Sequence, residues 1–544
     1  MGSTSEYWWT IFQSVAVCQL IGIICTCVYR RYNHPLANIP GPFLPAVTKL
    51  YQSYFNCRYY LEIERLHDQY GPVVRITPDE VHIATGSEEY EKIYHVGSKY
   101  AKSPNFYNAL CVPHSSVGTA SNEVHKIKRG AMNPIFSRQK VLDVESIVQD
   151  KVAKVISRLE NSIHTTRIGD ESGVDLHHAF RAVSVDVASE FSFGTCYNFL
   201  DKDDTGADFF EMARGIGPAL YAFQQFPSLQ RLALKIPPWL APLLSRPLGY
   251  VTSMQAECIR QINAVKEKMS QGHDTGRSTI FTSLLSNDDK PDGFRVPTTL
   301  KLKDEAYSVL VAAADTTGNA MTVAAFYAIY NPEIYEKLAK ELEDHFPDRV
   351  GQLPFVELER LPYLVRLPLS VYDYVQMLTK FIQTAVIQEG LRLSFGVVGR
   401  LPRVVPEFPT SWSTSFHGHR IPSGTIVSMS SWMMHRDPEI FPDPMKFDPE
   451  RWLQSTEQTQ RLNHNMVPFG RGSRQCVGMP LAYAEVYVML GTMFRRFPKE
   501  LRIRGTTPET MADYEDWFSS YHPYSKQDEW LRVSVEGGTY SDTK

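Results

Sequence analysis

The segment FGRGSRQCVGMPLAYAEVYVMLGTMF, residues 469–494, places one cysteine between a glycine-rich loop and an apolar run. The glycines allow the loop to turn sharply and to bring backbone N–H groups close to the sulfur of Cys476. The apolar spacing predicts a helix from about Met479 to Phe494, so Cys476 lies at a helix N-terminus. The dipole there stabilises a thiolate, which suits a nucleophile or a metal ligand, whereas an isolated cysteine is usually a buried structural residue.

The order of residues in the loop favours a metal ligand. The pattern F-G-x-G-x-R-x-C-x-G is met by Phe469, Gly470, Gly472, Arg474, Cys476 and Gly478. This pattern resembles the haem-binding loop of the cytochrome P-450 family. The resemblance implies that Cys476 is the thiolate axial ligand of haem b, which favours O–O cleavage. It also implies that Phe469 packs beside the loop, that Gly470 and Gly478 shape it, and that Arg474 pairs with a haem propionate.

A second motif lies upstream in DEAYSVLVAAADTTGNAMTVAAFYAIYNPE, residues 304–333. Its spacing predicts a long, buried helix from about Asp304 to Tyr330. Asp315 and Thr316 resemble the family's acid–alcohol pair, although Ala313 replaces a customary glycine. An acid beside an alcohol in a dry site can relay the two protons that dioxygen cleavage consumes, so both residues are expected to be catalytic. The alternative is a polar patch facing a neighbouring helix.

Two further groups of residues follow from the resemblance. Glu389 and Arg392 form an E-x-x-R pair one helical turn apart, and the family joins this pair to the arginine of a P-E-R-W segment, here Arg451, in a buried structural network. The expected partners of the haem propionates are Arg403 in GRLPRVVP, and Arg129 with His125, which stands where the family has tryptophan.

The N-terminal stretch WWTIFQSVAVCQLIGIICTCVY, residues 8–29, has no charged side chain and is long enough to span a hydrocarbon core of about 30 Å. Arg30 and Arg31 follow it, so residues 1–7 are expected in the lumen and the body in the cytosol. A cleaved signal peptide is the alternative, but its charge precedes the apolar run. We therefore expect a single-pass anchor in the endoplasmic reticulum membrane, a proline-rich hinge at 30–45 and a haem domain at 46–544.

The remaining composition is that of a globular protein of 544 residues with 43% hydrophobic residues. A formal net charge of −4 argues against a nucleic-acid partner, and eight irregularly spaced cysteines indicate a reducing compartment. Helical spacing dominates, with β-like runs at PVVRI and EVHIAT, so the fold class is mainly α with a small β-rich part, the cytochrome P-450 fold. The apolar stretch 226–244 is either a core loop or a second contact with the bilayer.

The resemblance is closest to fungal secondary-metabolite members of the trichodiene oxygenase type, through phrases such as HRDPEIFPDP. It implies a monooxygenase that inserts oxygen into a lipophilic small molecule of terpenoid or polyketide type. Electrons would come from NADPH through a separate reductase, because no flavin or nicotinamide segment is visible. Two alternatives stay open: a family member that rearranges or couples its substrate, and a haem-binding but inactive protein. Phe106, Tyr107, Val311, Ala314 and residues 395–398 are candidate pocket walls.

One segment, VRLPLSVYDYVQMLTKFIQ at residues 365–383, interrupts this pattern. Excising it joins LERLPYL to TAVIQEGLRL, which then reads as one amphipathic helix leading to Glu389 and Arg392. A valine codon begins with GT, as an intron donor site does, and the closing glutamine codon can be CAG, as an acceptor site requires. The codons for MLT can also contain a branch-point sequence. We therefore interpret the segment as a translated intron. The alternative is a native surface loop, since long insertions cost little loop entropy.

Overall fold

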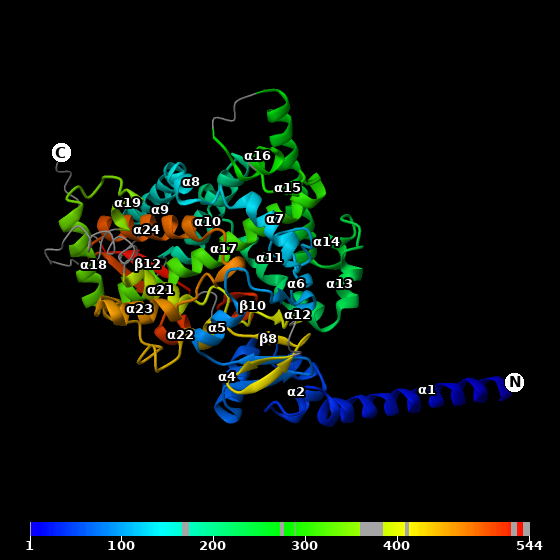
Figure 1. Cartoon of the computed structure of the whole chain (residues 1–544). Coiled ribbons are helices and arrows are strands. Elements are labelled where there is room, and N and C mark those ends of the chain that lie inside the picture. Colours follow the sequence, from blue (N-terminus) through cyan, green and yellow to red (C-terminus); the bar gives the residue numbers. More distant parts are fainter. Residues whose placement is uncertain are drawn as a thin grey trace.

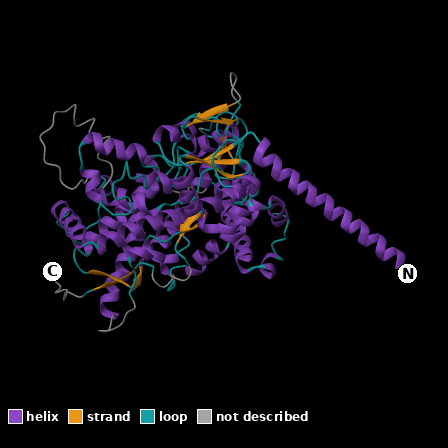
Figure 2. Cartoon of the chain, turned by 90° about the horizontal axis from the view of Figure 1, so that it is seen from below, coloured by secondary structure: helices purple, strands orange, loops and turns teal. Residues whose placement is uncertain are grey.

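The computed structural model describes residues 2–165, 173–272, 277–288, 290–359, 385–407, 413–523 and 530–536. The suspected intron at 365–383 lies outside the described residues. The predicted fold class is confirmed, because helices form most of the body and the short strands gather in small groups (Figures 1 and 2).

The longest buried helix is α17 (Thr299–Tyr330), which crosses the body (Figure 1). It starts five residues before the predicted Asp304 and ends where predicted, because Asn331 and Pro332 begin the next helix. Around it pack α10 (Leu176–Phe193), α15 (Arg246–Ser270), α21 (Ala385–Ser394) and α24 (Met479–Arg496). Helix α24 begins at the predicted residue and runs two residues further.

The other α-helices complete the body and are α2 (Phe43–Val47), α3 (Leu50–Phe55), α4 (Tyr59–Tyr70), α5 (Ser87–Ile93), α6 (Pro104–Asn108), α7 (Asn122–Met132), α8 (Arg138–Leu142), α9 (Glu145–Thr165), α11 (Ala207–Gly215), α12 (Gly217–Gln225), α13 (Pro227–Ala233), α14 (Ala241–Leu244), α16 (Ile280–Leu285), α18 (Pro332–His345), α19 (Phe355–Leu358), α22 (Ser431–His435), α23 (Thr456–Asn465) and α25 (Pro508–Met511). Short 3-10 turns include η4 (Pro449–Leu453) and η5 (Gly472–Arg474).

The main sheet has the order β1-β2-β8-β5-β3 and contains the two runs predicted as strands. Its members are β1 (Val73–Thr77), β2 (Glu80–Ile83), β8 (Ile426–Ser428), β5 (Arg403–Val404) and β3 (Ala101–Lys102), of which only the β2–β8 pairing is parallel among the described strands. A second sheet orders β4 (Val174–Asp175), β12 (Arg532–Val535) and β9 (Leu501–Arg504). Two hairpins complete the set: β6 (Ser413–Phe416) with β7 (His419–Pro422), and β10 (Glu515–Trp517) with β11 (Ser519–Tyr521).

Helix α1 (Gly2–Val28) leaves the body as an isolated rod and continues as a π-helical turn over Tyr29–Asn33 (Figure 1). Tyr7–Asn33 is apolar and long enough to cross a membrane, and none of its most apolar window is buried in the protein. Helix α17 passes the same test of length and composition, but it is mostly buried, as core helices are. The proline-rich segment at 30–45 is tied to the body, since Leu36 is buried and Arg75 donates to its backbone carbonyl.

Candidate active site

The cysteine loop is closed by its own backbone. The N–H of Cys476 donates to the carbonyl of Phe469 at 2.9 Å, and the Phe469 ring packs against Tyr483. Gly472 has a φ of 72°, and a Cβ there would lie 2.4 Å from a backbone oxygen of His95. A side chain at this position is therefore excluded by both conformation and space.

Cys476 keeps solvent-accessible surface, although the atoms of its loop and of α24 crowd around the sulfur. The backbone N–H groups of Gly478 and Met479 donate toward the sulfur, as the glycine pattern predicted. Burial raises the pKa of the Cys476 thiol, and these two N–H groups and Arg129 oppose the rise. A coordinating metal ion deprotonates a thiol outright, so an iron ligand would overcome this residual cost.

Basic side chains gather beside the loop: Lys102, His125, Arg129, Arg403 and Arg474. Burial, and then Arg403 and Arg474, hold the pKa of Lys102 well below its usual value. Burial and the neighbouring Arg474 lower the pKa of His125 to about 3. Positive groups that destabilise one another favour an anion among them, and haem carries two carboxylates. The cluster and the exposed Cys476 together fit haem.

The members of this cluster are held by different elements. Arg403 on β5 donates to the hydroxyl of Tyr107 at 2.8 Å. Arg474 donates to the carbonyls of Thr119, Ala120 and Ser121, and so ties the cysteine loop to the segment before α7. The pairing of Arg474 with a propionate stays a prediction. Sequence reasoning missed Lys102, because a lone lysine on a two-residue strand carries no recognisable signal.

The acid on α17 does not contact its alcohol neighbour. Asp315 is 1% exposed, and its carboxylate accepts from Nε of Arg181 on α10 at 3.2 Å and from the hydroxyl of Tyr521 on β11. Burial raises the pKa of Asp315, and Arg181 and Tyr521 only partly offset the rise. The hydroxyl of Thr316 instead donates to the carbonyl of Ala312 at 2.9 Å. The back-bonding predicted for this helix is therefore present.

The middle of α17 opens on the Thr316 side. Ala312 is exposed and Thr316 partly exposed, although most of the helix is buried. A Cβ on Gly396 would lie 3.5 Å from that of Thr316, so the loop after α21 passes over this opening. Of the candidate pocket walls, Ala314 and Phe395 are buried, and the Phe395 ring packs on Trp432.

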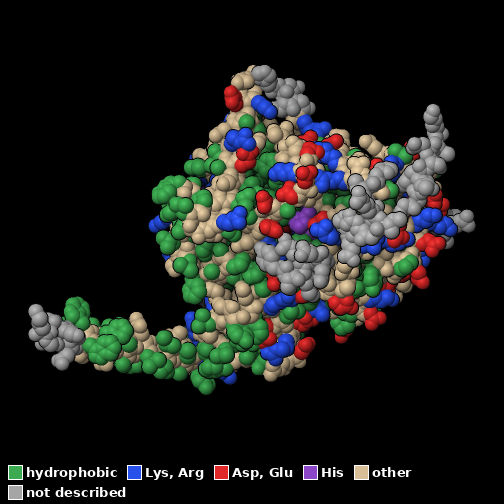
Figure 3. Space-filling view, turned by 180° about the vertical axis from the view of Figure 1, so that it is seen from behind, with side chains coloured by type: hydrophobic (Ala, Val, Ile, Leu, Met, Phe, Trp, Pro, Cys, Tyr) green, Lys and Arg blue, Asp and Glu red, His purple; other side chains and the backbone are tan. Residues whose placement is uncertain are grey.

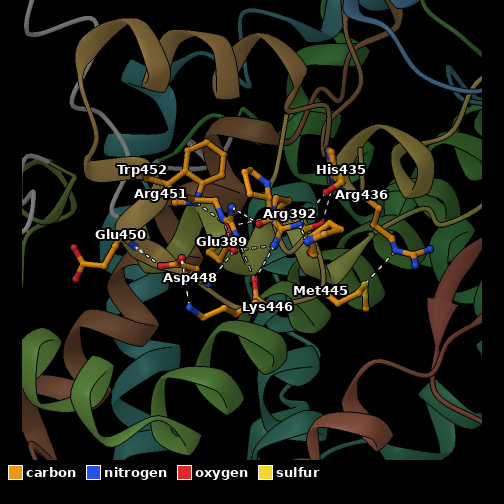
Figure 4. A network of polar contacts seen from close by, with 12 residues as sticks. Glu389, Arg392, His435, Arg436, Met445, Lys446, Asp448, Glu450, Arg451 and Trp452 are labelled. Carbon is orange, nitrogen blue, oxygen red and sulfur yellow. Dashed lines mark hydrogen bonds and ion pairs between the residues drawn. The ribbon is translucent and has the colours of Figure 1, made fainter. Parts of the chain in front are cut away.

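The predicted E-x-x-R network is assembled as expected and is shown in Figure 4. The carboxylate of Glu389 accepts from Nη2 of Arg392 at 2.7 Å, from Nε of Arg451 at 3.0 Å and from the indole of Trp452 at 2.9 Å. Burial acts to raise the pKa of Glu389, but Arg392 and Arg451 outweigh it and hold the pKa below its usual value. The charged form of the carboxylate is therefore favoured, as a structural group requires.

His435 connects this network to the cysteine loop, which the sequence did not predict. Its Nδ1 contacts the carbonyl of Arg392 at 2.9 Å, and its Nε2 accepts from the N–H of Val467 at 2.9 Å. Val467 stands two residues before Phe469. The buried ring thus spans the gap between α21 and the ligand loop.

Three features together define a haem-thiolate protein. They are a cysteine at the glycine-bounded N-terminus of α24, a cluster of cationic side chains beside it, and the buried network of Glu389, Arg392 and Arg451. The family model for Cytochrome P450 matches residues 39–367 and 375–514, so the chain belongs to this family. It is a monooxygenase with haem as cofactor and electrons from a redox partner, as predicted.

Curated relatives cover most of the chain at similar identity. The cytochrome P450 monooxygenase TRI4 of Trichoderma arundinaceum is 31% identical over 88% of this chain and 87% of its own. The conidiogenone synthase PchP450 of Penicillium rubens is 31% identical over 90% and 92%, and the tryptophan 6-hydroxylase fscE of Fusarium equiseti is 31% identical over 94% of each. The predicted resemblance to fungal secondary-metabolite members is confirmed.

Proposed function

We propose that this chain is a membrane-anchored monooxygenase that hydroxylates or epoxidises a lipophilic small molecule of terpenoid or polyketide type. The observation that carries the proposal is the exposed Cys476, whose sulfur receives N–H groups at the start of α24. The proposed electron source is an NADPH-dependent cytochrome P450 reductase in the same membrane.

When bound, haem supplies the oxygen activation that places one atom of dioxygen in the substrate and releases the other as water. In our proposal Cys476 binds the iron, and the basic residues beside it hold the propionates: Lys102, His125, Arg129, Arg403 and Arg474. Asp315 and Thr316 move the two protons that the reaction consumes, through water, because their side chains do not touch.

The exposed apolar surface supports the membrane assignment. Residues around α2 and α3 and around α13 and α14 leave large apolar side chains exposed: Phe43, Leu44, Leu50, Tyr54, Phe226, Leu229, Leu232, Trp239 and Leu243. Hydrophobic side chains gather on the side of the body from which α1 projects (Figure 3). We propose that this surface, with α1, rests on the cytosolic face of the endoplasmic reticulum membrane.

A spectrum of the reduced, carbon monoxide-bound protein tests the thiolate. We expect the haem-thiolate band in the wild type and its loss in Cys476→Ala; a normal band in the variant would overturn the ligand assignment. Product analysis under labelled dioxygen then separates oxygen insertion, which labels the product, from a redox-neutral rearrangement, which does not.

A second candidate is a haem-binding but inactive chain. The family match is interrupted at residues 368–374, inside the suspected intron, and Glu389 follows that segment closely. Transcript sequencing and a variant that lacks residues 365–383 test this candidate. Higher haem occupancy and turnover in the shortened chain support a mis-spliced product, and lower values support a native loop.

A further inference from the structure

The end of α1 is fastened to the body by one buried arginine. Arg75 on β1 is 2% exposed, and its Nη1 donates to the carbonyl of Arg30 at 2.9 Å and to that of Leu36 at 3.4 Å. Its Nη2 donates to the carbonyl of Pro78 at 2.7 Å. The carbonyls of Arg30 and Leu36 belong to the proline-rich segment 30–45, which the sequence predicts to be a hinge.

Carbonyl oxygens, and not a carboxylate, hold Arg75 in the described part of the chain. Asp79, the acidic group that acts on it, forms its ion pair with Lys49 at 3.2 Å. Burial, and then Arg30 and Arg31, lower the pKa of Arg75 to about 10. A buried guanidinium is costly unless hydrogen bonds satisfy it. The positions of the cation and of the main-chain carbonyls therefore depend on each other.

The carbonyl of Arg30 lies at a helix terminus. It belongs to the π-helical turn Tyr29–Asn33 that continues α1, and the last carbonyls of a helix lack partners within it. The helix dipole favours a cation at such an end. Arg75 is therefore a C-terminal cap supplied from β1. The guanidinium of Arg30 in turn donates to the carbonyl of Val47, the last residue of α2, at 2.6 Å.

The chain between α1 and α2 lies against the main sheet. The N–H of Arg75 donates to the carbonyl of Pro40 at 2.7 Å, and a Cβ on Gly41 would fall 2.7 Å from the carbonyl oxygen of Arg75. Leu36 and Ile39 pack into an apolar cluster with residues of this sheet. Release of the segment would expose both apolar side chains to water, which costs free energy.

We propose that Arg75 clamps the end of α1 to the haem domain, so that the two meet a phospholipid bilayer as one rigid unit at a fixed angle. The inference rests on the proposed membrane anchoring. The exposed side chains of Phe43 and Leu44 lie next to the clamp, because their helix α2 contacts the π-helical turn. The rigid unit places this part of the apolar surface on the leaflet that α1 enters. The segment 30–45 then acts as a bracket and not as a hinge.

The test uses full-length holoenzyme in oriented multilayers of phosphatidylcholine. The electron paramagnetic resonance signal of low-spin ferric haem, recorded against sample angle, gives the orientation of the haem plane and its spread. We expect one narrow orientation in the wild type and a broader spread in Arg75→Met, which removes the donors and keeps an unbranched side chain. Val74→Ala is the matched control, because it weakens packing on the opposite face of β1, and it should keep the narrow orientation.

Trypsin, which cuts after Arg30 and Arg31, reports on the clamp directly. We expect slow cleavage there in the wild type and in Val74→Ala, and about tenfold faster cleavage in Arg75→Met, because proteases cut backbone that has opened. The carbon monoxide spectrum checks that each variant keeps its haem. If Arg75→Met folds poorly, a Gly-Gly insertion between Tyr32 and Asn33 displaces Arg30 while Arg75 keeps its other carbonyls, and the same broader spread is expected.

Two results would contradict the proposal. One is an unchanged haem orientation and spread in Arg75→Met and in the insertion variant, and the other is equal cleavage in Arg75→Met and the wild type. If the wild type does not sediment with phosphatidylcholine vesicles, the proposed membrane anchoring itself fails. If it sediments and the variants match it in orientation and spread, the clamp fails alone.

Discussion

Glu389 and Asp315 are both almost fully buried carboxylates beside an arginine, yet the protein treats them differently. Glu389 accepts from Nε and Nη2 of Arg392, from Arg451, from Trp452 and from the backbone of Asp448. Asp315 accepts from Arg181 and Tyr521. The pKa of Glu389 is accordingly held down, whereas burial keeps that of Asp315 raised. The supply of charged donors separates a structural carboxylate from one that can exchange a proton.

The largest expected effect comes from removing the structural carboxylate. Glu389→Ala leaves Arg392 and Arg451 buried without their anion, and breaking a buried pair costs about 3–5 kcal/mol. We expect little haem-loaded protein and a much lower unfolding free energy, measured by the carbon monoxide spectrum and by denaturation. Normal haem content and stability in Glu389→Ala would show that the network does not brace the loop.

Asp315→Asn should lower turnover more than stability, the reverse of Glu389→Ala. The amide keeps the shape of the side chain but cannot donate and regain a proton, so we expect turnover roughly 10²-fold lower. Haem content should stay near that of the wild type, and the loss of stability at neutral pH should be smaller than in Glu389→Ala, because the amide oxygen still accepts from Arg181 and Tyr521. Steady-state kinetics with a fixed excess of reductase measures turnover, and denaturation measures the unfolding free energy. Loss of folding instead of turnover would place Asp315 with Glu389 as a structural residue.

The two carboxylates should also respond to pH with opposite signs. The folded-state pKa of Glu389 is lowered, so its charge stabilises the fold above its unfolded-state pKa, and that contribution disappears as pH falls. The folded-state pKa of Asp315 is raised, so the wild type loses stability as pH rises through that value. From about pH 4 to pH 7, Glu389→Gln should therefore lose stability relative to the wild type and Asp315→Asn should gain it. Denaturation midpoints of the wild type and both variants across this pH range measure these changes. If the stability difference from the wild type changed with pH in the same direction for both variants, the contrast between Glu389 and Asp315 would be wrong.

This difference between the two carboxylates could be predicted from the sequence only in part. Glu389 and Arg392 lie within one helical turn, and Cys476 lies in a ten-residue pattern, so local spacing identified them. Arg181 and Tyr521 are 134 and 206 residues away from Asp315. Their contacts arise from the packing of α10 and a C-terminal hairpin on α17, for which no local pattern exists. The same holds for Lys102 and His435, single residues that acquire roles only where distant elements meet.

The mildest change to Glu389 is the removal of one neutral hydrogen-bond donor. Trp452→Phe deletes the indole N–H that donates to Glu389 and keeps an aromatic ring in its place. Both arginines remain, so we expect a loss of about 1 kcal/mol in unfolding free energy and no change in turnover per haem. Tyr521→Phe likewise removes one neutral donor, but from a carboxylate with a single charged partner, and should change turnover more than stability. Denaturation and steady-state kinetics on the same preparations of the two variants test this expectation. A turnover defect in Trp452→Phe as large as that in Tyr521→Phe would contradict it. The number of donors would then not set the role of a buried carboxylate in this protein.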